Sequence, residues 1–90
     1  MQKLLIEALD KAEAGDWDGA HDIVQTYDGE GAAWLHAYLH KVEGDESNAR
    51  YWYRKAGMEP FEGDRTEELY ALRQALTAGT TDMMGQKPGA

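Results

Sequence analysis

Apolar residues recur along this chain at the three- and four-residue spacing of amphipathic helices. Glycine-containing breaks separate five such stripes, and the expected helices cover about 2–14, 16–27, 32–43, 45–57 and 64–78. The third is apolar over a wide arc, which predicts a central helix contacted from two sides. No stretch alternates with a period of two, so we expect an all-α protein.

Two of the breaks are Gly-Asp pairs, Gly15-Asp16 and Gly44-Asp45, which lie 29 residues apart. Each pair is typical of a helical hairpin turn, because glycine ends one helix and aspartate caps the next. The same shift of 29 residues aligns small residues with small ones and large apolar residues with large ones: Ala8 with Ala37, Ala20 with Ala49, Leu5 with Trp34, Leu9 with Tyr38, Ile23 with Trp52 and Val24 with Tyr53. The pattern predicts an internal repeat of a helical hairpin.

The segments around these turns resemble a known family. "AEAGDWDGAHDIV" and "KVEGDESNARYWYRKA" look like the second-helix half of tetratricopeptide repeats, and "NARYWYRKAG" resembles the A-x-x-W-Y-x-K-A signature of the related Sel1-like repeats. The resemblance covers about residues 3–61. It implies two stacked antiparallel hairpins with a C-terminal capping helix, in a family that mostly binds proteins or peptides on a concave face.

Length and composition indicate one domain, at residues 1–78, followed by a flexible tail at 79–90 without periodicity. The chain has 9 Lys and Arg against 17 Asp and Glu, a net charge of −8, which argues against binding to nucleic acid or to anionic membranes. It has no cysteine, which excludes disulfides and thiolate chemistry. No hydrophobic run reaches the length of a signal peptide or a membrane span, so we expect a cytoplasmic protein.

Little in the sequence points to catalysis. His36 and His40 have the i, i+4 spacing of a metal-binding helix, but the glutamate of the metalloprotease motif is missing. Glu43 lies about 10 Å along the helix axis from His36, too far for the three side chains to converge on one ion unaided. His21 could supply a third ligand only if the fold brings it there. We expect both residues on the polar stripe, no metal or other cofactor, and a protein that is not an enzyme.

Charge is unevenly distributed along the chain. Residues 1–30 carry a net charge of −6 and residues 58–78 one of −3, whereas residues 31–57 carry +1. Within this basic island Arg50, Tyr51 and Arg54 point away from the Trp52 stripe. These bases either pair with nearby acids such as Glu46, or form a recognition patch of the residue types enriched at interface hot spots.

The expected function is a small non-catalytic interaction module. It would bind a protein or peptide partner through a surface on the second hairpin formed by His36, His40, Arg50, Tyr51 and Arg54. One alternative is a small metal- or anion-dependent enzyme using His36 and His40, and another is an adaptor whose acidic first hairpin docks on a basic partner. We also expect a homodimer, since no preceding repeat covers the apolar stripe of the first helix.

Overall fold

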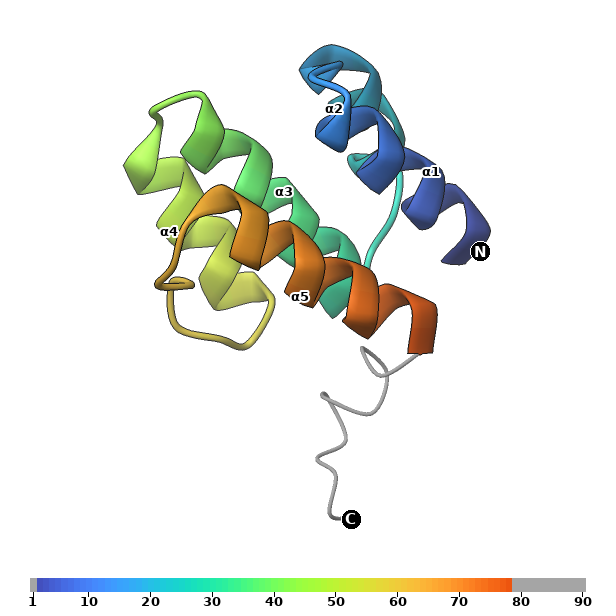
Figure 1. Ribbon diagram of the computed structural model, residues 1–90. Coiled ribbons are helices and arrows are strands. Elements are labelled where there is room, and N and C mark those ends of the chain that lie inside the picture. Colours follow the sequence, from blue (N-terminus) through green and yellow to red (C-terminus); the bar gives the residue numbers. More distant parts are fainter. Residues whose placement is uncertain (1, 79–90) are drawn as a thin grey trace, which may run out of the picture.

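Each Gly-Asp pair closes a helical hairpin in the computed structural model, which describes residues 2–78 (Figure 1). Gly15 and Gly44 have φ angles of 87° and 88°, a left-handed conformation that favours glycine. The next residues are the caps: Asp16 accepts a hydrogen bond from the Gly19 amide and Asp45 one from the Asn48 amide. The two turns are therefore built in the same way, as their spacing predicts.

All regular structure in residues 2–78 is helical, which confirms the expected class. The helices are α1 (Gln2–Glu13), α2 (Trp17–Val24), α3 (Glu30–Val42), α4 (Glu46–Lys55) and α5 (Arg65–Ala78). None of them is long and apolar enough to cross a membrane. The expected tail at 79–90 lies outside the described residues.

Helix boundaries differ most from the sequence expectation between α2 and α3. The expected second helix extends to residue 27, but α2 ends at Val24. The chain then makes a tight turn, in which the Thr26 amide donates a hydrogen bond to the Ile23 carbonyl and the Tyr27 amide donates one to the Val24 carbonyl. Gly29, at φ 112°, then starts α3 two residues earlier than expected. The turn "DGEG" thus contributes its last two residues to α3.

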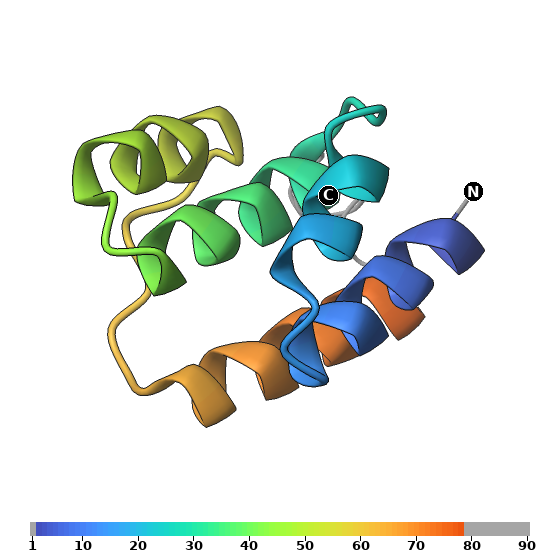
Figure 2. The ribbon, with the colours of Figure 1, turned by 90° about the horizontal axis from the view of Figure 1, so that it is seen from above.

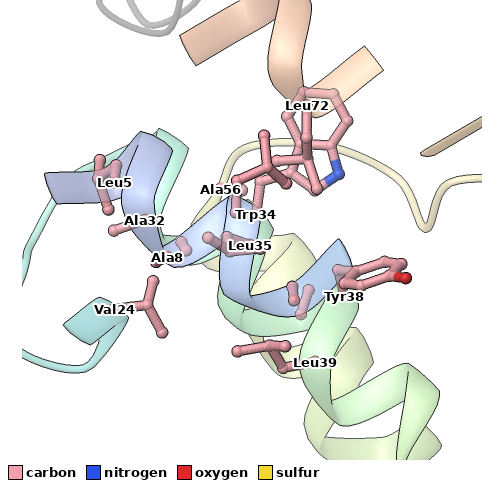
Figure 3. Packing of buried hydrophobic residues seen from close by; sticks show 14 of the residues in the cluster. Leu5, Ala8, Val24, Ala32, Trp34, Leu35, Tyr38, Leu39, Ala56 and Leu72 are labelled. Atoms are coloured by element: carbon pink, nitrogen blue, oxygen red, sulfur yellow. The ribbon is translucent and has the colours of Figure 1, made fainter. Parts of the chain in front are cut away.

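The aligned positions of the two hairpins have matching burial. Ala8 and Ala37 are both fully buried, and Val24 and Tyr53 are each 1% exposed. The core joins α3 to all the other helices, with Trp34 of α3 and Leu72 of α5 in one buried cluster (Figure 3). The wide apolar arc of α3 is the reason: residues 31–39 are buried without interruption.

The position of α5 differs from the expectation. We expected it to cap one end of the stack and to leave the first helix uncovered. Instead α5 turns back along α1 and α3, the first helices of the two hairpins, and lies beside α1 (Figure 2). Leu5 and Leu9 of α1 are consequently buried within the monomer, and Arg73 of α5 pairs with Asp10 and Glu13 at 2.7 and 2.9 Å.

A buried carboxylate fixes this arrangement. Glu68 of α5 is 0% exposed and accepts hydrogen bonds from the Trp34 indole at 3.0 Å, from the Lys41 ammonium at 2.8 Å and from the Tyr53 hydroxyl. Burial and the neighbouring Glu68 carboxylate raise the pKa of Tyr53, which keeps its hydroxyl a donor. Donors from α3 and α4 therefore converge on one residue of α5.

Replacing Glu68 should cost far more stability than its single charge suggests. Glu68→Ala leaves the Lys41 charge and two buried donors without their acceptor, and we expect a loss of roughly 3–5 kcal/mol. Glu68→Gln keeps an acceptor oxygen and should lose less. Urea unfolding followed by circular dichroism measures both losses, with the exposed Glu62→Ala as the control. A loss under about 1 kcal/mol for Glu68→Ala would show that the network contributes little.

Candidate functional site

The five residues of the expected binding surface do not lie together. Arg50, Tyr51 and Arg54 are exposed on α4, as expected. The expectation that His36 and His40 lie on an outward polar stripe is wrong, since His36 is 7% exposed and the His40 side chain 16%. The histidines turn inward because α2 and α4 pack on either side of α3 and leave it little free surface. The chain thus has two candidate sites, an exposed one on α4 and a largely buried one between α2 and α3.

The exposed site is the outer face of α4, formed by Arg50, Tyr51, Arg54 and Lys55 (the α4 face). The Tyr51 side chain, 47% exposed, packs edge-on against Trp52, and the Lys55 ammonium lies 5.7 Å from each of the two ring centroids. Arg50 has a carboxylate at ion-pair distance, that of Glu46 at 3.8 Å, and both partners are largely exposed. Neither Arg54 nor Lys55 forms an ion pair within residues 2–78. Over the described residues, the α4 face therefore carries two exposed basic side chains without an ion-pair partner.

Two hollows flank this helix. One, of about 220 Å³, lies between α4 and the α2–α3 turn and is lined by Tyr27, Glu30, His36, Trp52 and Lys55 among others. The other, of about 210 Å³, lies on the side of Arg50, beside Tyr53 and Phe61. Each is large enough for one side chain of a partner.

The buried site brings together all three histidines of the chain. His21 of α2 reaches His36 and His40 of α3, and one nitrogen from each residue lies within 4.8 Å of the other two. The His21 and His36 Nε2 atoms are 3.0 Å apart, so one ring donates its hydrogen and the other accepts. The His36 and His40 rings stack at 5.0 Å between centroids.

Trp52 covers the cluster from α4. Its indole stacks on the His36 ring at 3.9 Å between centroids and 11° between planes. Burial, followed by the nearby His21 and His40, lowers the pKa of His36 to about 4. His36 is therefore a neutral imidazole at pH 7.

His40 is the third member of the cluster, and its Nδ1 is buried without a hydrogen-bond partner in the described part of the chain. Carboxylate oxygens of Glu43 and Asp45 lie 3.4 and 3.9 Å from this nitrogen. Sequence reasoning placed Glu43 too far away to join the histidines, and the structure places it behind His40. A small shift would let Nδ1–H donate to Glu43, which would leave Nε2 as the free nitrogen of His40.

From the sequence, His21 could join the other two histidines only if the fold brought it there, and the structure does bring it there. Its spacing from the other two histidines carries no signal, because the contact depends on how α2 crosses α3. The available clue was that all three histidines of the chain fall on two consecutive helices that pack against each other.

Comparisons with known proteins found no match: no family model, no curated protein and no solved structure resembles the chain significantly. The likeness to tetratricopeptide and Sel1-like repeats therefore rests on the residues quoted above.

In metal-free protein kept in a chelator, stability should fall as the pH is lowered from about 6.5 to about 4. The pKa of His36 is near its ordinary value of 6.5 in the unfolded chain and about 4 in the folded chain. Between these values the unfolded state binds more protons, so lowering the pH favours unfolding. Well above pH 6.5, where His36 is neutral in both states, it contributes no pH dependence. Urea unfolding at several pH values measures the slope.

His36→Phe is the matched comparison for this measurement. It keeps an aromatic ring against Trp52 but cannot be protonated, so its stability should depend less on pH in this window. Carboxylate titration is common to both proteins and cancels in the difference. Identical slopes would contradict a buried neutral His36.

Proposed function

We propose that this protein is a small non-catalytic interaction module of tetratricopeptide-like hairpins, and that it binds an acidic segment of a protein or peptide partner through the α4 face. One observation supports this most strongly: Arg54 and Lys55 have no acidic partner in residues 2–78, although the chain carries a net charge of −8. In such an acidic chain, a basic side chain without a binding role would be expected to form an ion pair with a nearby carboxylate.

The chemistry of the α4 face supports the same proposal. Arginine and tyrosine are enriched at interface hot spots, because each combines a large contact area with directional hydrogen bonds. Arg50 and Arg54 are one helical turn apart, with Tyr51 beside them, so they can bind neighbouring carboxylates of one partner. The hollows on the two sides of α4 offer places for apolar side chains of the same segment.

The placement of α5 also favours α4 as the binding surface. The first helices of both hairpins are covered by α5, so the face they form is occupied within the chain. Within residues 2–78, no helix covers the outer face of α4 in this way. The acidic first hairpin, by contrast, uses Asp10 and Glu13 to bind Arg73.

Charge reversal on α4 tests the proposal. A partner recovered by affinity capture from native cells, after nuclease treatment, should bind Arg54→Glu at least about tenfold more weakly than the unchanged protein. Added salt should weaken binding of the unchanged protein more than that of the variant. Lys11→Glu, the same charge change on α1, is the matched control and should bind normally. Equal affinities for the two variants would place the binding site elsewhere.

Self-association is a second prediction, and it now rests on two exposed apolar side chains instead of on an uncovered first helix. The stripe of α1 is largely covered, but Leu4 is 45% exposed and Tyr70 of α5 67% exposed. A two-fold homodimer that uses the surface of α1 and α5 would form through these two residues. Sedimentation equilibrium at micromolar concentration tests it, and a single 10.1 kDa species for the unchanged chain would exclude it.

A further inference from the structure

Beyond the proposed interaction, we infer that His21, His36 and His40 form a site for one divalent transition metal ion, of which Zn²⁺ fits best. Three nitrogen atoms from two packed helices already lie within 4.8 Å of one another. Neutral imidazole suits zinc, copper and nickel, and three histidines are an established zinc donor set. No ion is needed to assemble the cluster, because packing of α2 and α4 on α3 does so.

The geometry is close to what zinc requires. Zinc–nitrogen bonds of about 2.0–2.1 Å in a tetrahedral site place neighbouring nitrogens about 3.3 Å apart. The His21 and His36 Nε2 atoms are 3.0 Å apart, and the longest separation in the cluster, at most 4.8 Å, must shorten by roughly 1.5 Å. A small rotation of partly exposed side chains, such as those of His21 and His40, can supply that change.

The surroundings of His40 suit a metal ligand. Within residues 2–78 its Nδ1 is buried without a hydrogen-bond partner, and a carboxylate oxygen of Glu43 lies 3.4 Å away. With Nε2 of His40 on the metal, Nδ1–H would point to the Glu43 carboxylate, the kind of contact that orients a ligating histidine and raises its basicity.

The ion would have both a structural and a chemical consequence. It would join α2 to α3 and so tie the first hairpin to the second. The eight-residue α2 makes its main contact outside its own hairpin with α3, so the ion would strengthen that contact. Three protein ligands also leave a fourth position for water or a partner's side chain. His36 lines the hollow beside Trp52 and Lys55, so that position could face a bound ligand.

Titration with Zn²⁺ tests the site directly. Untagged protein is stripped with a chelator and then titrated with zinc sulfate in competition with a chromophoric chelator. We expect one equivalent bound per chain and a rise in the unfolding temperature. Substituted Co²⁺ should give the strong visible absorption of a tetrahedral nitrogen-rich site.

Variants identify the ligands. His21→Ala and His40→Ala should each weaken zinc binding by at least about 100-fold, and Glu43→Gln by about tenfold. Asp22→Ala, at the exposed position next to His21, is the matched control and should bind as the unchanged protein does. Circular dichroism of each metal-free variant shows that it is folded, and zinc affinity is compared only between folded proteins.

Two results would overturn the inference. One is the absence of zinc binding by the unchanged protein at concentrations up to about 100 µM. The other is binding that persists in both His21→Ala and His40→Ala, which would assign the ion to surface carboxylates. Neither result bears on the α4 face, so this inference and the proposed function can fail separately.

Discussion

A carboxylate with no access to water, that of Glu68, holds the fifth helix to the second hairpin. Burying a carboxyl group away from water costs free energy, and the cost is offset only if hydrogen-bond donors surround it. Trp34, Lys41 and Tyr53 provide those donors, and they come from the two helices of the second hairpin. The network can form only when α3, α4 and α5 have one relative placement, so it specifies the arrangement as well as stabilising it.

The position of α5 determines which surfaces remain for function. Since it lies along α1 and α3, the face formed by the first helices of the hairpins is part of the core. The second helices stay outside: α4 carries exposed bases, and α2 presents His21 to the histidines of α3. The exposed site therefore lies on a helix that α5 does not cover, and the buried site forms where α2 lies beside α3.

The sequence predicts the helices well because their ends are set by local interactions. A left-handed glycine and an aspartate cap are fixed by residues a few positions apart, and the Asp64–Glu67 pair at the start of α5 forms two reciprocal hydrogen bonds as its spacing indicates. The path of α5 across the hairpins depends instead on contacts between residues far apart in sequence. One clue was available: Glu68 is one turn before Leu72 and two before Leu76, on the apolar stripe, where a charged residue needs partners.

The candidate sites show the same division. The outward direction of Arg50, Tyr51 and Arg54 follows from helical periodicity, which the sequence contains. The burial of His36 depends on Trp52 stacking over it from α4, and the contact with His21 depends on how α2 crosses α3. Periodicity within one helix cannot reveal a neighbour supplied by another.

Native-state hydrogen exchange tests most directly whether α5 is an integral part of the fold. Its amides near Leu72 should exchange only through global unfolding, with the same free energy as those of α3 around Leu35. Exchange of the α5 amides through a local opening, at markedly lower free energy and with α3 still protected, would contradict the account.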